Sequence, residues 1–122
     1  YKDVWYVEAD MHRGRVTRKQ FNNLQAFWPG MQTMVGDLES ASRTANAFME
    51  VWNGFGATPE DFDFEAWEPL SGGTRRRYPL RPELAESIYL LHEATQDDSW
   101  LLAGRDIVRS LQRIPVRCHD CF

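Results

Sequence analysis

The stretch R-P-E-L-A-E-S-I-Y-L-L-H-E-A-T-Q-D-D-S-W-L-L-A-G-R-D-I-V-R-S-L-Q, residues 81–112, predicts two consecutive helices. Two apolar stripes with helical spacing are separated in it by the turn Q-D-D-S. The first helix is predicted to start at Pro82 and to end near Thr95, and Asp97 or Asp98 is a good N-cap for the second, which runs to about Gln112. The inward positions are Leu84, Ile88, Leu91, Trp100, Ala103, Ile107 and Leu111. Such a pattern predicts a pair of antiparallel helices.

Upstream, residues 37–53 are predicted to form the cleanest amphipathic helix, which Asp37 caps and which Gly54 and Gly56 end. Its apolar stripe, at spacings of three and four, consists of Leu38, Ala41, Ala45, Phe48 and Trp52. A buried helix is expected before it, from about Asn23, broken or kinked near Pro29-Gly30.

The first residues have strand character instead. Residues 4–11 are predicted to be a strand, Gly14 a turn, and residues 15–18 a second short strand. Residues 57–77 are expected to be loop. The predicted class is mainly α, with paired antiparallel helices and a small β-hairpin near the N-terminus.

Composition excludes several classes of protein. The chain has 122 residues and a formal net charge of −4, with one short basic run at residues 75–77, which does not favour nucleic-acid binding. No apolar run approaches the ~20 residues that span a membrane. The first residues lack an initiator Met and the pattern of a signal peptide, which suggests a processed or excised piece.

The two cysteines, Cys118 and Cys121, form the motif C-H-D-C. This spacing is compatible with half of a zinc site, a redox pair or two unrelated thiols. The second half of a zinc motif is missing, and the pair does not follow a strand and open a helix as redox pairs do.

The residues with most chemical interest are Arg81, Glu83 and Glu86. With Pro82 as the first helical residue, Arg81 is the predicted N-cap, and Glu83 lies near the positive end of the helix dipole, which explains it as a favourable helix start. Glu86 adds a like charge one turn later, which is unfavourable unless a cation or proton intervenes. A neighbouring arginine could neutralise the pair, or the two acids could serve a pocket as a general base or through a metal-bound water.

Short polar residues elsewhere have two interpretations. Asn22 and Asn23 are good helix caps, and each could instead point a polar group into a cavity. Glu60, which follows Pro59, is interpreted as a loop residue or cap.

Several ordered motifs together resemble a known family. They are Y-P-L-R-P-E-L-A-E-S, the following Y-L-L-H-E-A-T-Q-D-D-S-W-L-L-A-G-R-D-I-V-R-S-L, N-L-Q-A-F-W-P-G-M-Q-T-M-V-G-D, W-N-G-F-G-A-T-P-E and W-Y-V-E-A-D-M. The resemblance is to class I α-1,2-mannosidases, glycoside hydrolase family 47. Within that family, the segments look most like the ER degradation-enhancing α-mannosidase-like proteins, and the similarity covers nearly the whole chain.

The resemblance implies a barrel of seven helical hairpins, several times longer than this chain. Residues 1–122 would then be a central-to-late slice of the domain, containing neither of its ends. Family members remove α-1,2-linked mannose from N-glycans with inversion and require Ca²⁺. The general acid and another catalytic Asp are expected upstream, and the Thr that binds Ca²⁺ directly is expected near the end of the domain, so the isolated chain is expected to be inactive.

Residue by residue, Glu83 resembles the general base, Arg81 the arginine that holds the substrate, and Glu86 an acid that reaches the calcium through water. The processing mannosidases have Asp-His where this chain has Asn22-Asn23, and their His contacts the substrate. Asn23 occupies the position of that His. That departure puts fine trimming specificity in doubt, and Asn23 is predicted to take the substrate-binding position.

The implied setting is the ER lumen or secretory pathway, with high-mannose N-glycans of misfolded glycoproteins as substrates. Cys118 lies near a cysteine of the degradation-type relatives, which associate with disulfide-isomerase-type partners, so a mixed disulfide, a structural disulfide and unpaired thiols are all open. Two alternatives to an enzyme remain. One is a non-catalytic glycan- or client-binding relative, and the other is a helical scaffold with Glu83 and Glu86 as surface charges.

Overall fold

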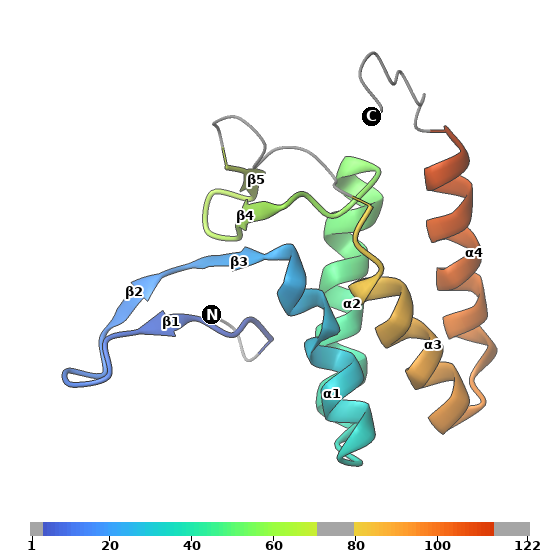
Figure 1. The fold of residues 1–122 in the computed structure, drawn as a ribbon, viewed down its shortest axis with the longest axis horizontal. Helices are drawn as coiled ribbons and strands as arrows, with labels where there is room; N and C mark the ends of the chain where they lie inside the picture. The colour runs from blue at the N-terminus through green and yellow to red at the C-terminus, as the bar shows by residue number, and fades with distance from the viewer. Residues whose placement is uncertain (1–3, 71–79, 114–122) are drawn as a thin grey trace, which may run out of the picture.

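The computed structural model describes residues 4–70 and 80–113, which form helices and two small antiparallel sheets (Figure 1). The α-helices are α1 (Trp28–Met34), α2 (Leu38–Phe55), α3 (Glu83–Thr95) and α4 (Asp98–Arg113), and a 3-10 helix, η1 (Asn23–Phe27), leads into α1. The strands are β1 (Glu8–Ala9), β2 (Val16–Arg18), β3 (Gln20–Asn22), β4 (Asp61–Asp63) and β5 (Glu68–Pro69). The prediction of a mainly α fold with small strands is confirmed.

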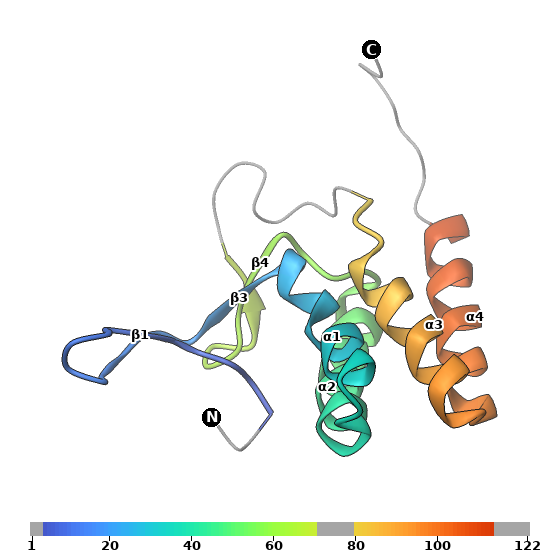
Figure 2. The same cartoon turned by 60° about the horizontal axis from the view of Figure 1, so that its bottom comes forward.

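The helices form two antiparallel pairs, α1 with α2 and α3 with α4 (Figure 1). Helix α3 lies between the first pair and α4 (Figure 2), and it packs against η1, α1, α2 and α4. The predicted pairing of helices is therefore confirmed. A closed barrel is not visible in the part of the chain that the structure describes.

The core forms where α2, α3 and the three-stranded sheet meet. Its largest fully buried side chains include Phe48 and Trp52 of α2, Phe62 of β4, and Leu84 and Leu91 of α3. Burying each such side chain contributes about 1.5–3 kcal/mol. The predicted inward faces of α2 and α3 are thus the faces that pack.

The second sheet, in the order β3-β4-β5, joins two segments that are distant in sequence. Strand β3 pairs with β4 so that Phe21 lies opposite Phe62, and β4 pairs with β5. The prediction that residues 57–77 are loop is wrong for β4 and β5. The alternation D-F-D-F-E at 61–65 is a strand signal, but it is short and becomes a strand only when a partner is available.

The N-terminal hairpin is shorter than predicted. The prediction of a strand over residues 4–11 is too long, since only Glu8–Ala9 pairs, antiparallel, with β2. The preceding Trp5 instead enters the core, where its ring stacks on Phe21 and Phe64 with centroids 5.1 Å and 5.4 Å apart. The segment before β1 therefore packs against the core through Trp5 and does not extend the pairing with β2.

The predicted start of α2 at Asp37 is confirmed, whereas its end lies two residues later than predicted, so that Gly54 is inside the helix, and the start of α3 is shifted. Asp37 caps α2 by accepting the Ser40 N–H, and Gly56 ends it with φ of 80°, in the left-handed region that glycine tolerates. The prediction that Arg81 caps α3 is wrong. The helix begins at Glu83, Pro82 occupies the N-cap position, and the guanidinium of Arg81 is instead engaged elsewhere in the fold.

The break expected near Pro29-Gly30 lies slightly earlier. Residues 23–27 form the 3-10 helix, and Pro29 is in the first turn of α1, where a missing N–H costs nothing. Asn22 caps the 3-10 helix by accepting the Leu24 N–H, which confirms the predicted capping role.

Some predictions concern residues outside the described ranges. These are the basic run at 75–77 and the C-H-D-C motif with Cys118 and Cys121. Within residues 4–70 and 80–113, no helix has the length and apolar character needed to cross a membrane.

One buried hydroxyl ties α3 to the start of α1. The Ser87 side chain is fully buried; its Oγ donates to the Ala26 carbonyl at 2.7 Å and accepts the Gly30 N–H at 3.0 Å. Gly30 permits this approach, because a Cβ there would lie 3.0 Å from the Phe27 ring and 3.2 Å from both Leu90 and the Ser87 hydroxyl. Ser87 therefore fixes the separation of the two helices.

Replacing Ser87 with Ala is expected to lower the free energy of unfolding by about 1–3 kcal/mol, because a buried carbonyl and a buried N–H lose their partner. Urea unfolding followed by circular dichroism measures the change. Ser110→Ala on α4, a half-buried serine, is the matched control. Equal effects of the two substitutions would contradict a special role for the Ser87 hydroxyl.

Candidate active site

The start of α3 presents two acids of unequal environment. Glu83 is the first helical residue and is partly buried, whereas Glu86, one turn later, is exposed. The Oε2 atom of Glu83 is buried and accepts no hydrogen bond within the described residues. Both carboxylates lie near the free N–H groups of the helix, where negative charge is favoured. Glu83 is thus the acid with unused accepting capacity inside the fold.

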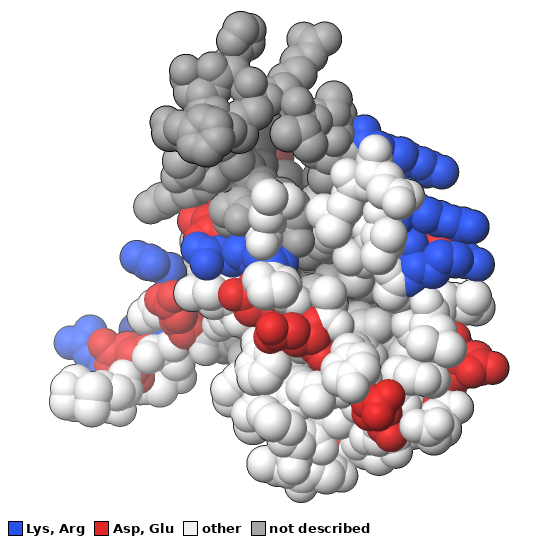
Figure 3. Space-filling view, turned by 45° about the vertical axis from the view of Figure 1, so that its right-hand side comes forward, with Lys and Arg blue, Asp and Glu red and all other residues white. Residues whose placement is uncertain are grey.

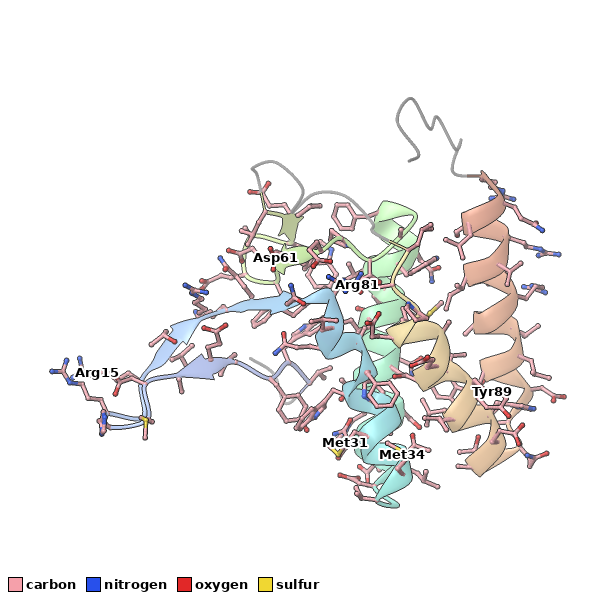
Figure 4. The ribbon with its side chains drawn as sticks, viewed as in Figure 1. Arg15, Met31, Met34, Asp61, Arg81 and Tyr89 are labelled. Carbon is pink, nitrogen blue, oxygen red and sulfur yellow. The ribbon has the colours of Figure 1, made fainter. Side chains whose placement is uncertain are left out.

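Arg81 lies immediately before this helix and pairs with Glu60. Its Nε donates to Glu60 Oε2 at 2.7 Å and its Nη2 donates to Oε1 at 2.6 Å, so the pair is bidentate. The side chains are only 32% and 19% exposed, respectively. Figure 4 shows Arg81 beside the start of α3, on the same side of the molecule as Asp61 of β4. The ion pair therefore joins two segments that are separated by 21 positions.

The pair also shifts the titration of both partners. The hydrogen bonds from Arg81 hold the pKa of the Glu60 carboxyl below its usual range, and Asn22 adds a further lowering hydrogen bond. Hydrogen bonding to Glu60 raises the pKa of the Arg81 guanidinium, and the negative charge of Glu83 acts in the same direction. Both groups are thus held in their charged forms.

Asn22 and Asn23 hold the segment that carries Glu60. The Asn23 N–H donates to the Glu60 carbonyl at 2.7 Å, and its side-chain Nδ2 donates to the Thr58 carbonyl at 3.2 Å. Asn22 Nδ2 donates to Asp61 Oδ1 at 3.0 Å. Asn23 is only 1% exposed, so in this structure its amide serves the 58–60 loop. Its contact with a substrate stays a prediction.

Three chain segments therefore converge: residues 22–23, residues 58–61 and residues 81–83. Arg81 and Glu83 come together as the sequence predicts, Asn23 joins them through Glu60, and Glu86 lies on the adjacent turn of α3. Sequence reasoning missed Glu60, which it interpreted as a loop residue or cap. No local pattern reveals a bidentate partner on a different element.

Charge is distributed unevenly on the surrounding face. Acidic side chains follow α3, and basic side chains gather over α4 (Figure 3). On α3 the acids are Glu83, Glu86 and Glu93, and on α4 the arginines are Arg105, Arg109 and Arg113. The acidic row starts at the site described above.

The described residues do not form a metal site by themselves. They contain no group of three or more His, Cys, Asp or Glu side chains arranged to hold an ion. Glu83 and Glu86 have carboxylate oxygens, which suit Ca²⁺, and Oε2 of Glu83 is buried with no hydrogen-bond partner among the described residues. This fits a contribution through water, with the direct ligands supplied from outside the described residues.

Enzymes that hydrolyse glycosidic bonds use Asp and Glu carboxyl groups as acid and base. Residues 1–119 match the family model of glycosyl hydrolase family 47, and the chain belongs to that family. The resemblance inferred from the sequence motifs is thereby confirmed.

Named relatives agree with the family. The chain is 49% identical over 112 residues to alpha-mannosidase I MNS4 of Arabidopsis thaliana, a match that covers 92% of this chain and 18% of that protein. It is 40% identical over 117 residues to ER degradation-enhancing alpha-mannosidase-like protein 2 of Homo sapiens, covering 95% of this chain and 20% of that protein. The chain thus spans about a fifth of the length of these two curated relatives.

The Arg81–Glu60 pair predicts a pH dependence of stability. Because the pKa of Glu60 is lowered in the folded chain, its ionised form stabilises the fold above the ordinary pKa range of glutamate, and this contribution is lost as the pH falls through the lowered pKa. Glu60→Gln is expected to lower the free energy of unfolding near pH ~7, with the difference from wild type vanishing toward pH ~3.

Urea unfolding at several pH values measures this difference. Glu65→Gln is the matched control, because Glu65 also pairs with a cation, Lys19, but its side chain is 55% exposed. If the difference in free energy of unfolding between wild type and Glu60→Gln stayed constant with pH, the role given to the Glu60 charge would be contradicted.

Proposed function

We propose that this chain is part of a glycosidase that removes α-1,2-linked mannose from N-glycans of misfolded glycoproteins, with inversion and with Ca²⁺. The observation that carries the proposal is the partly buried Glu83, whose Oε2 accepts no hydrogen bond from the described residues, next to Arg81 in a chain of glycosyl hydrolase family 47. The names of the relatives support mannose as the sugar and ER degradation as the setting.

Glu83 is proposed as the general base. A base must be ionised and must have a lone pair available within reach of the attacking water. Oε2 of Glu83 has an available lone pair, because it accepts no hydrogen bond from the described residues. In an inverting glycosidase the base lies ~6.5–9.5 Å from the general acid, which leaves room for that water. The acid is proposed to lie upstream of residue 1.

Arg81 is proposed to hold the substrate, because a guanidinium fixed in one plane presents directed donors to sugar hydroxyls. Glu86, exposed one turn beyond Glu83, is proposed to contact Ca²⁺ through a water. Ca²⁺, when bound, would orient and acidify a water at the site. The domain of the full-length protein is proposed to be a barrel of seven helical hairpins, of which α1–α4 form two.

Replacing Glu83 with Gln in the full-length protein is expected to reduce kcat for mannose release by about 10²–10⁴-fold, because the amide cannot accept the proton. Release of mannose from α-1,2-mannobiose measures the effect. Glu93→Gln, on the exposed face of the same helix, is the control and should leave the rate unchanged.

Two outcomes would contradict the proposal. Unchanged trimming by Glu83→Gln would favour a non-catalytic glycan- or client-binding protein, or a scaffold in which the acids are surface charges. Mannose release by the isolated chain of residues 1–122 would contradict the placement of the general acid outside it.

Calcium removal distinguishes the role proposed for Glu86 from the role proposed for Glu83. Chelation is expected to abolish mannose release by the full-length protein, and added Ca²⁺ to restore it. Glu86→Gln is expected to raise the Ca²⁺ concentration needed for half-maximal activity by about 10–100-fold, because it weakens a hydrogen-bonded water on the metal. A calcium requirement equal to that of Glu93→Gln would rule out the role proposed for Glu86.

A further inference from the structure

We propose that Glu60 is a positioning residue that sets the orientation of Arg81 and keeps its guanidinium directed away from Glu83. This inference rests on the proposed function and extends it to a residue on the loop before β4. It follows from the geometry of the Arg81–Glu60 pair, from the way Glu60 is itself held, and from the unpartnered oxygen of Glu83.

The geometry of the pair determines the orientation of the Arg81 guanidinium as well as its distance from the Glu60 carboxylate. Two parallel bonds, Nε to Oε2 at 2.7 Å and Nη2 to Oε1 at 2.6 Å, define the plane of the guanidinium. A single contact would let the group rotate. The plane of Arg81 is therefore set by the plane of the Glu60 carboxylate.

Glu60 can impose this orientation because its own backbone is anchored. It follows Thr58 and Pro59, which are both buried, and its carbonyl accepts the Asn23 N–H at 2.7 Å. The next residue begins β4, which pairs with β3. A carboxylate on so constrained a backbone has few positions available, and Arg81 adopts the one that it permits.

The other ion pairs of the described residues have a different character. Those of Arg18, Arg43 and Arg109 with acids are long single contacts, 3.6–3.9 Å, between side chains that are 44–85% exposed, and such pairs contribute little. Arg105 donates twice to Asp106, at 3.0 Å and 2.9 Å, but both bonds end on the same oxygen, Oδ1. The side chains of this pair and of the Lys19–Glu65 pair are 37–55% exposed. The shielded, bidentate pair occurs at the site.

The alternative partner of Arg81 is the nearby Glu83. The negative charge of Glu83 already acts on the Arg81 guanidinium, and its buried Oε2 accepts no hydrogen bond from the described residues. Without the Glu60 carboxylate, the guanidinium would turn toward Glu83. Glu60 thus preserves both an oriented arginine for the sugar and an accepting oxygen on the base.

The test uses the full-length protein with Glu60→Gln, Arg81→Gln and the double variant, assayed on α-1,2-mannobiose. Glu60→Gln is expected to reduce kcat/KM by about 10–100-fold, with a rise in KM as the larger part, because a misplaced clamp weakens substrate positioning. The double variant is expected to match Arg81→Gln within about twofold, because Glu60 acts through Arg81.

The control is Glu65→Gln, which removes the carboxylate of another ion pair near β4 and should change kcat and KM by less than about twofold. If Glu60→Gln fails to fold, Glu60→Asp carries the test. It keeps the charge and draws the guanidinium toward β4, and KM is expected to rise by about 3–10-fold.

Failure of the proposed function is recognised separately, by a wild-type protein without turnover or by an active Glu83→Gln variant. In that case, calorimetric binding of α-1,2-mannobiose to the Glu83→Gln protein, with and without Glu60→Gln, still measures the effect on positioning, expected to be about tenfold in Kd. Unchanged KM and Kd in Glu60→Gln would overturn the inference. The inference would also be overturned if the effect of the double variant equalled the product of the effects of the two single substitutions.

Discussion

The rest of the structure depends on the burial of one face of α3. Leu84, Ile88 and Leu91 are buried there, and Ser87 on the same face bonds the backbone at the start of α1. Apolar burial holds the helix between its neighbours, and the hydroxyl fixes its separation from α1. Because the helix is fixed along its length, its first residue, Glu83, is fixed as well.

The second important interaction is the ion pair between Glu60 and Arg81, which joins two segments that are distant in sequence. The Glu60 carbonyl accepts a hydrogen bond from the Asn23 N–H, and the Glu60 carboxylate accepts hydrogen bonds from Arg81, which precedes α3. The side chains of Arg81 and Glu60 are 32% and 19% exposed, so their attraction is screened less than that of a fully exposed pair. Packing thus brings the segments together, and the pair then specifies how the polar groups face each other.

Much of the helical architecture could be predicted from sequence because its signals are local. The stripe that ends at Trp52, the cap at Asp37 and the turn at 96–99 each act within a few residues, and each is confirmed. The small sheet could not be predicted in the same way, since β4 depends on pairing with β3, about forty positions earlier. The N-cap assigned to Arg81 failed because the helix begins one residue later than predicted, at Glu83, with Pro82 at the N-cap position.

The helix pairs, the family and the acids at the start of α3 could all be predicted from the amino-acid sequence alone. Periodicity and ordered motifs are properties of the chain, and they require no knowledge of how distant segments meet. Only the tertiary structure decided that Glu83 is partly buried while Glu86 is exposed, and that Glu60 is the partner of Arg81. Burial and ion pairing depend on distances between segments, and those distances exist only after the helices and the sheet have packed.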